Sequence, residues 1–462
     1  MLFSLALALV SCSATPPVVD SSSVDPDILG QAETGDPYAM GVLGALYRRG
    51  EGVPKNGEKA LLWASRSAGK DNPIGLYNLA ILTRDGEPTT QNKKKADQLI
   101  KKSIPGLQKL GDTGNPRALT NLGYLYETGW GLPKDLKLAV EAYQKAADQG
   151  FPRAQNNLGL IYQWKEQPDY VQAVSWFTKA ADQGFSRAQA NLARNYELGL
   201  GLPPNLGLAI RWYQSAAKRG SSMAQNRLGS LYETGVGFSK SFGEAFTWYR
   251  KAAQEGYGPA MVNIGRLYEL GKGVPQDESA SFYWYLKGMR QAPEIAKQKV
   301  SQMLERLRSR RKTLSLKGTK LAGFDLKGLN FSMVQLDGAD LSGADLSWAQ
   351  FKKSSMKNVN LMGADLSFAL MSGADLQGSN FSKANLQETQ LVGGNLSHSN
   401  LKDARLKSTV LSDANLQGAD LSGVIARGVN LEGANLKEAL GVPDDWAPGV
   451  GASGIWSSKN GH

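Results

Sequence analysis

The chain has 462 residues, of which 41% are hydrophobic, and its formal net charge is +11. This length and composition are those of a folded protein of about three domain equivalents. One cysteine excludes an internal disulfide framework, and the two histidines, His398 and the terminal His462, are too few for most histidine-based metal sites and general bases. The composition therefore disfavours most hydrolases, zinc proteins and redox enzymes, whereas the basic charge points to polyanionic partners.

The first ten residues, MLFSLALALV, are apolar, too few to span a bilayer, and typical of a secretion signal. The run leads into Leu9-Val10-Ser11-Cys12, which resembles the lipobox of bacterial lipoproteins. The resemblance implies that residues 1–12 are a lipoprotein signal peptide with Cys12 as the lipidated residue. Because Ser13 follows the cysteine, it also implies an anchor at the periplasmic face of the outer membrane. An ordinary cleaved secretion signal is the alternative, and residues 13–34 are expected to be a Ser/Pro-rich tether.

A repeat of about 36 residues occupies the next part of the chain. Trp176, Trp212, Trp248 and Trp284 are spaced 36 residues apart, and the phrase Ala-Ala-x-x-Gly recurs in register with them. Within a unit, apolar residues recur at helical spacing on both sides of a glycine-containing loop. A glycine that ends one helix and a proline that begins the next are typical of this arrangement. Each unit is therefore predicted to be a pair of helices.

These units resemble the Sel1-like repeats, a branch of the tetratricopeptide class, through the elements A-x3-L-G-x2-Y, G-x-G-x-P and W-x3-A-A-x2-G. About seven units are expected over residues 35–290. The second is irregular, because Pro105 is expected to interrupt its second helix, and the fourth lacks the G-x-G loop. The resemblance implies an α/α superhelix that binds other proteins on its concave surface and has no chemistry of its own. Phosphate-binding loops are disfavoured, because no loop ends in G-K-[ST].

From residue 316 the period changes to five. Every fifth residue from Leu316 to Leu436 is Leu, Phe or Met, with Ala426 as the one exception. Phrases such as Ala-Asp-Leu-Ser-Gly resemble the pentapeptide-repeat family. The resemblance implies that residues 314–440 form a right-handed quadrilateral β-helix with four pentapeptides per turn. Residues 20 apart should then stack, and residues 441–462 form a tail in which Trp446 or Trp456 covers the end of the β-helix.

Two stacked columns follow from this period. The first is an apolar column of Phe331, Phe351, Met371, Leu391, Leu411 and Leu431. The second is a polar column of Asp340, Asn360, Asn380, Asn400 and Asp420, which is able to form a side-chain amide ladder. A carboxylate site is the alternative interpretation of the polar column. His398 is expected to be a solvated surface residue rather than a catalytic one.

Most of the net charge lies between the two repeat regions. Residues 287–320 carry 11 basic and 2 acidic side chains, whereas residues 321–440 carry 10 and 12. A capping helix that joins the two regions is predicted over residues 291–313, with an apolar stripe and a basic face. The basic face is a candidate site for an anionic partner, and charge reversal there should abolish any binding to anionic surfaces. Its residues are Lys297, Lys299, Arg306, Arg308, Arg310, Arg311 and Lys312.

The sequence thus predicts an α/α helical-repeat superhelix followed by a β-helix. It favours a non-catalytic scaffold or adaptor of the bacterial cell envelope, with no catalytic, cofactor or metal site. A regulator of cell-wall or stress signalling and a host-interaction factor are alternatives. A β-lactam-binding enzyme is disfavoured, since no Ser-x-x-Lys stands in a supporting context. Imitation of DNA is disfavoured by the balanced charge of the pentapeptide region, and nucleic acid binding by the export signal.

Overall fold

The structure is a computed structural model that describes residues 26–86, 92–289, 292–310, 313–444 and 446. It divides into two compact units, the first ending at Tyr257 and the second beginning at Gly258. Predicted features at residues 1–25, including Cys12, and Trp456 lie outside the described residues. Each unit is described below by itself.

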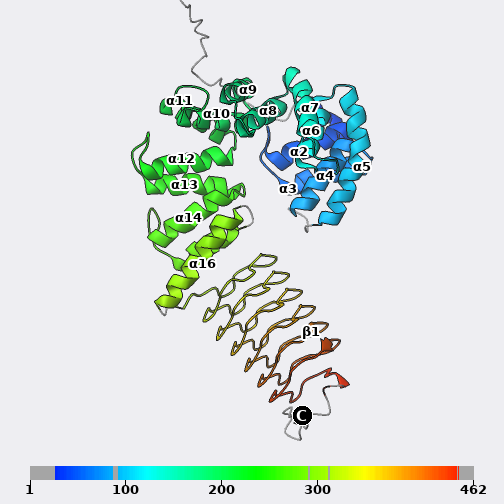
Figure 1. The fold of residues 1–462 in the computed structure, drawn as a ribbon, viewed down its shortest axis with the longest axis vertical. Coiled ribbons are helices and arrows are strands. Elements are labelled where there is room, and N and C mark those ends of the chain that lie inside the picture. Colours follow the sequence, from blue (N-terminus) through cyan, green and yellow to red (C-terminus); the bar gives the residue numbers. More distant parts are fainter. Residues whose placement is uncertain (1–25, 87–91, 290–291, 311–312, 445, 447–462) are drawn as a thin grey trace, which may run out of the picture. The chain divides into compact units, whose positions relative to one another are not determined.

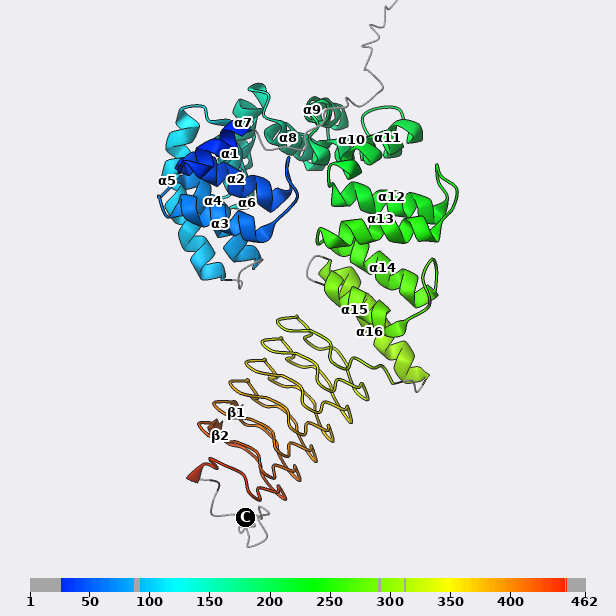
Figure 2. The same cartoon turned by 180° about the vertical axis from the view of Figure 1, so that it is seen from behind.

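The first unit is a series of paired antiparallel helices, which confirms the predicted helical-repeat solenoid (Figure 1). A short helix, α1 (Pro26–Glu33), packs on the first pair. The first helices of the pairs are α2 (Pro37–Arg49), α4 (Pro73–Asp85), α6 (Pro116–Thr128), α8 (Pro152–Trp164), α10 (Ser186–Leu198) and α12 (Ser222–Thr234). The second helices are α3 (Gly57–Ala68), α5 (Lys93–Asp112), α7 (Leu136–Asp148), α9 (Tyr170–Asp182), α11 (Leu206–Lys218) and α13 (Phe242–Gln254). Figure 2 shows the same pairs from behind.

Repeated capping residues set the helix boundaries. Each second helix begins after an Asn, Asp or Ser whose side chain accepts a hydrogen bond from a backbone N–H of the first turn. Five of the first helices end at a left-handed glycine, such as Gly129 with a φ of 73°. The fourth unit, which lacks the G-x-G loop, ends α8 at Lys165 in an extended conformation instead. The loop chemistry of the sequence therefore fixes the length of each unit.

Small residues allow the two helices of a pair to approach closely. A Cβ atom added at Gly123 of α6 would lie 2.6 Å from the ring of Tyr143 in α7, and Gly229 faces Tyr249 in the same way. The hydroxyl of Tyr143 donates to Glu127 over 2.7 Å, and that of Tyr249 donates to Glu233 over 2.8 Å. These two pairs of helices are thus each joined by a buried ring that ends in a polar contact.

The expectation that Pro105 interrupts the second unit is wrong. Helix α5 continues from Lys93 to Asp112 with Pro105 inside it. Pro105 and Lys101, four residues earlier, are both exposed, so the carbonyl that loses its N–H donor belongs to a residue on the exposed side of the helix. Burial of Ile100, Ser103 and other residues on the opposite side keeps the helix in place.

The second unit joins three helices to the pentapeptide coils through one continuous core. The helices are α14 (Gly258–Leu270), α15 (Glu278–Gly288) and α16 (Pro293–Ser309). The ring of Phe282 in α15 meets Phe331 edge to face at 6.3 Å, and Ser279 donates to the Ser315 carbonyl. The predicted apolar stripe of α16 is buried in the same core. Its residues are Ala296, Val300, Met303, Leu304 and Leu307.

The pentapeptide region stacks residues that are 20 apart, as four pentapeptides per turn require. Parallel bridges link Ser315 to Gln335, and the series continues to a bridge between Asp420 and Leu440. Regular strand is confined to β1 (Arg405–Lys407) and β2 (Ile425–Arg427), because each side of a coil is only a few residues long. Every fifth residue from Gly318 to Glu438 turns the chain with a φ between 54° and 71°. These turns account for part of the glycine excess.

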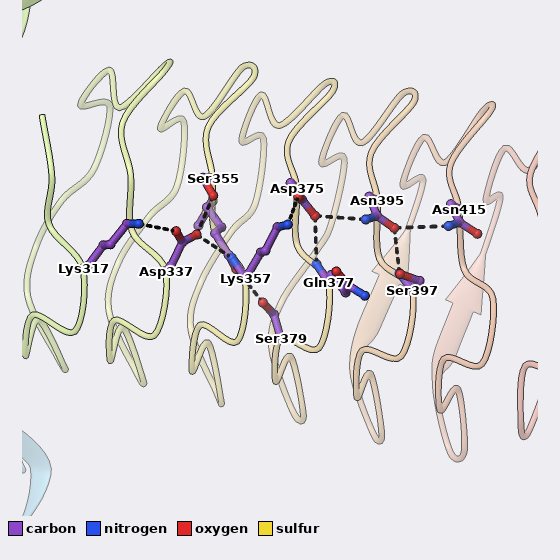
Figure 3. A network of polar contacts seen from close by, with 11 residues as sticks. Lys317, Asp337, Ser355, Lys357, Asp375, Gln377, Ser379, Asn395, Ser397 and Asn415 are labelled. Carbon is purple, nitrogen blue, oxygen red and sulfur yellow. Dashed lines mark hydrogen bonds and ion pairs between the residues drawn. The ribbon is translucent and has the colours of Figure 1, made fainter. Parts of the chain in front are cut away.

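Both predicted columns are present. The rings of Phe331 and Phe351 stack with centroids 5.3 Å apart, and the rest of the apolar column is buried. In the polar column, the amide of Asn360 donates to Asp340 over 3.0 Å and that of Asn380 donates to Asn360 over 3.1 Å. A neighbouring column repeats the pattern, since Asn395 donates to Asp375 and Asn415 to Asn395 (Figure 3). The first three residues of the predicted polar column and the neighbouring column therefore form amide ladders.

The division at Gly258 does not coincide with the predicted domain boundaries at residues 290 and 314. Residues 258–289 form the seventh helix pair, yet they share the core of the pentapeptide coils. At the other end of that core, Trp446 is 5% exposed and covers the last coil, as predicted. Within the described part of the chain, no helix has the length and apolar character needed to cross a membrane.

Candidate functional site: an arginine-lined cavity

A cavity of about 320 Å³ lies among the first helices of five successive repeats. Helices α2, α4, α6, α8 and α10 all contribute side chains to its wall. Helices from five units can meet around one space only if the solenoid curves around it. The cavity therefore occupies the inner surface of the helical repeats.

Arginines from both ends of the helices converge on this cavity. Arg48 and Arg49 lie in the last turn of α2, where a cation is favourable beside the helix C-terminus. Arg153 and Arg187 are each the second residue of their helices, α8 and α10. Arg117 is the second residue of α6 and lies near enough to affect the titration of Arg49. The repeat register thus brings arginines of three units to one surface.

Glu51 is the carboxylate that meets this arginine group. Its Oε2 atom lies 2.5 Å from Nη2 of Arg153 and 3.4 Å from Nε of Arg49. Burial raises the pKa of Glu51, but Arg153, Arg49 and the other guanidinium groups outweigh that effect and hold the pKa at about 2. Glu51 is therefore ionised at neutral pH.

The arginines outnumber the carboxylate that neutralises them. Burial, with Arg153 adding to it and Tyr77 opposing it, lowers the pKa of Arg48 to about 10. Burial and Arg153 also lower the pKa of Arg49 well below its usual value. The Nε atoms of Arg48, Arg49 and Arg153 are buried and have no hydrogen-bond partner among the described residues. The wall therefore carries more positive than negative charge.

The remaining wall combines aromatic and amide groups. Tyr77, Tyr124 and Phe185 supply rings, and burial raises the pKa of Tyr77 to about 12. Asn156 accepts from the Asn191 amide over 2.9 Å. Among the described residues, no group of three or more His, Cys, Asp or Glu side chains could hold a metal ion. The arrangement is suited to binding an anion with an attached apolar part.

The basic face predicted on α16 is only partly exposed. Arg306 pairs with Glu269 of α14, and Arg308 donates to the Leu304 carbonyl. Lys297 and Lys299 are half-buried, Arg310 is exposed, and Arg311 and Lys312 lie outside the described residues. This face stays a predicted anion site. His398 is exposed at a turn, as expected, and His462 lies outside the described residues.

The arginine-lined cavity was missed by the sequence analysis, although a signal for it exists. The phrases Pro116-Arg117-Ala118, Pro152-Arg153-Ala154 and Ser186-Arg187-Ala188 place arginine at one register position in three successive units. A charged residue that recurs at the same position in successive repeats marks one face of a solenoid. The contact with Glu51 is not readable in this way, because 102 residues separate it from Arg153.

Two family models match the chain. The Sel1 repeat model matches seven segments, which are residues 37–72, 73–103, 116–151, 152–185, 186–221, 222–257 and 258–291. The model of pentapeptide repeats matches residues 315–358, 330–367, 360–397 and 399–437. No curated protein matches the chain.

Several solved structures are similar to parts of the chain. A Sel1 repeat protein from Oxalobacter formigenes is 30% identical, with 60% of this chain and 78% of that one covered and a TM-score of 0.39. A protective antigen of uropathogenic Escherichia coli strains is 29% identical, with coverages of 61% and 59% and a TM-score of 0.37. The pentapeptide repeat protein Rfr23 from the cyanobacterium Cyanothece 51142 is 29% identical over 30% of this chain and 95% of its own, with a TM-score of 0.20.

Proposed function

This chain belongs to the Sel1 repeat family, and from that membership we propose that it is a non-catalytic scaffold that binds other proteins on the inner surface of its helical repeats. Sel1 repeat proteins are generally protein-interaction scaffolds. Pentapeptide repeat proteins are likewise generally non-catalytic. The proposal therefore assigns recognition to the chain and no reaction.

The observation that carries this proposal is the convergence of five successive repeats on one cavity. Packing within a single helix pair does not require its residues to line a space shared with four other units. The wall offers guanidinium, ring and amide groups to a ligand. Like charges held close together cost stability, so a group of arginines in the wall of a cavity favours a role in binding.

We further propose that the protein acts in the bacterial cell envelope, anchored by lipid on Cys12 at the periplasmic face of the outer membrane. The support is the sequence of the first thirteen residues, which resembles a lipoprotein signal. The pentapeptide coils, taken to be a right-handed quadrilateral β-helix, would then serve as a rigid support for the helical repeats. Their continuous core and ladders of hydrogen bonds favour that stiffness.

In vivo cross-linking with mass spectrometry tests both parts of the proposal. The wild-type protein should capture a reproducible partner in the membrane fraction, and Cys12→Ala should release the protein from that fraction. Arg187→Glu, at an exposed residue of the cavity, should reduce capture of the partner, whereas Arg211→Glu, at an exposed residue of α11, should not. A wild-type protein that captures nothing would overturn the scaffold. A Cys12→Ala variant that stays in the membrane would overturn the anchor.

A further inference from the structure

We infer that the arginine-lined cavity binds a protein segment that carries at least two carboxylates, through Arg48, Arg49, Arg153 and Arg187. This inference rests on the proposed function, which makes the partner a protein, and adds the chemistry by which the partner is recognised. The carboxylates are Asp or Glu side chains, with or without the carboxylate of a chain end.

The charge balance of the wall is the first argument. Apart from Arg84, four arginines line the cavity, and Glu51 makes ion pairs with two of them, Arg49 and Arg153. The other acidic side chains of the wall are already engaged, since Asp85 pairs with Arg84 and Glu127 accepts from Tyr143. Charges of one sign at short range in a partly buried site repel one another and favour an anion. One added carboxylate leaves the group still positive, so two carboxylates fit its charge better.

The binding preference of the guanidinium group is the second argument. Arg49 and Arg153 line the cavity, and their side chains are only 8% and 14% exposed. Carboxylate oxygens are the acceptors that guanidinium donors bind best, often through two parallel hydrogen bonds. The contact that Arg153 already makes with the Glu51 carboxylate shows that these side chains can adopt the required arrangement.

The mixed lining favours a peptide over a simple anion. Beside the arginines, the wall holds the rings of Tyr77, Tyr124 and Phe185 and the amide groups of Asn156 and Asn157. A peptide supplies carboxylates, apolar parts and backbone N–H and C=O groups together. A sulfate ion supplies only charged oxygen atoms.

The size and lining of the cavity set the length of the bound segment. A volume of about 320 Å³ is at the lower end of the range of ligand pockets, so a short acidic stretch fits rather than a folded surface. Tyr77, Tyr124 and Phe185 would cover the apolar parts of the segment, and Asn157 could bind its backbone. Arg187 is exposed at this wall, where an incoming segment would meet it first.

Isothermal titration calorimetry of the full-length protein with short synthetic peptides tests the inference. One peptide carries a central Asp-Asp pair and a second carries Asn-Asn in its place, each with a free or an amidated C-terminus. We expect the amidated Asp-Asp peptide to bind at least about tenfold more tightly than the amidated Asn-Asn peptide. The free and amidated forms then report whether a chain end or the side chains supply the carboxylates. Sodium sulfate at matched ionic strength serves as the simple-anion competitor.

Two substitutions and one control locate the binding. Arg187→Gln should weaken the Asp-Asp peptide about tenfold, whereas Arg211→Gln removes the same charge from α11 and should leave the affinity unchanged. Glu51→Gln should tighten binding, because it removes a competing carboxylate and keeps an acceptor. Equal affinity for both peptides, or sulfate that displaces the Asp-Asp peptide at equal concentration, would overturn the inference.

The outcomes separate this inference from the proposed function. Partners captured by the wild-type protein and lost in Arg187→Glu, together with no binding of the acidic peptides, would overturn the carboxylate chemistry and leave the scaffold standing. Binding of the acidic peptides by a protein that captures no partner would support the cavity's chemistry and overturn the scaffold.

Discussion

The guanidinium of Arg153 donates to the carboxylate of Glu51 over 2.5 Å, although 102 residues separate them in the chain. Arg153 is the second residue of α8 and Glu51 follows α2, so the contact joins the fourth repeat unit to the first. It shows that the first and fourth units meet across the inner surface. The balance between this one carboxylate and several arginines governs both the stability of the first unit and the charge of its cavity.

Replacement of Glu51 should therefore destabilise the protein more than replacement of its partner. Glu51→Gln leaves the arginines without the carboxylate between them, which should lower the free energy of unfolding by about 3 kcal/mol. Arg153→Gln leaves Glu51 beside Arg49 and also removes repulsion, so we expect a loss of less than about 1 kcal/mol. Urea denaturation of both variants measures the difference. Equal losses would show that the ion pair acts as an isolated contact.

The low pKa of Glu51 predicts a specific loss of stability in acid. Because the folded-state pKa is about 2 and the ordinary value is 4.5, the stabilisation is complete above pH 4.5 and is lost as the pH falls towards 2. The wild-type protein and Glu51→Gln should therefore converge in stability over this window. Denaturation midpoints measured from pH 6 to pH 2.5 check this. Parallel curves would mean that the carboxylate titrates as a free group.

The buried tyrosines offer a matched comparison between two repeats. Tyr143 donates to Glu127, for which no second donor is found among the described residues, so Tyr143→Phe should cost about 2 kcal/mol. Tyr213 donates to Glu197, which also accepts from Arg227, so Tyr213→Phe should cost less than about 1 kcal/mol. Thermal unfolding of the two variants measures the order. The reverse order would indicate that ring packing dominates.

The close contact at Gly123 predicts that even an alanine side chain at this position destabilises the protein. Gly123→Ala would place a Cβ atom 2.6 Å from the Tyr143 ring, and we expect a loss of about 2 kcal/mol despite the better helix propensity of alanine. The control is Gly243→Ala in α13, where no atom lies within 4 Å of the new Cβ. That variant should be neutral or gain up to about 1 kcal/mol. Circular dichroism melting curves distinguish the two.

The amide ladder predicts that the wild type and an Asn360→Asp variant respond to acid in opposite directions. Burial raises the pKa of Asp340, but hydrogen bonds from Ser342 and Asn360 outweigh it and lower the pKa, so the wild type loses stability as the pH falls below 3.8. Asn360→Asp would put a second carboxylate against Asp340 and should destabilise the coils by about 2 kcal/mol at pH 7. Lower pH should relieve this repulsion, because one carboxyl group then becomes protonated.

A second variant in another ladder controls for that result. Asn415 lies between Asn395 and Asn435, so Asn415→Asp meets amides rather than a carboxylate. Its stability should change little and should not rise in acid. Unfolding by guanidinium chloride at pH 7 and pH 4 compares the two variants, and an acid-induced gain in both would contradict the role of Asp340.

Local patterns determined what could be predicted from the sequence. The 36-residue and five-residue periods gave the helix pairs and the columns, because each position repeats its neighbours' environment, as Phe331 and Phe351 do. Pro105 was misjudged because the local rule ignores which side of α5 is exposed. The cavity was missed because its residues are brought together by the curvature of the solenoid, which depends on small rotations between many units. No local pattern gives the contact between Glu51 and Arg153.

The shared core of the last helix pair and the pentapeptide coils bears on how such a gene could be assembled or divided. A recombination point at codon 291 or 314 would separate Phe282 from Phe331 and expose the end of the coil stack to water. A point at codon 258 leaves that apolar end covered by α14, α15 and α16. Exchange of modules between proteins of this kind should therefore move these three helices together with the coils whose apolar end they cover.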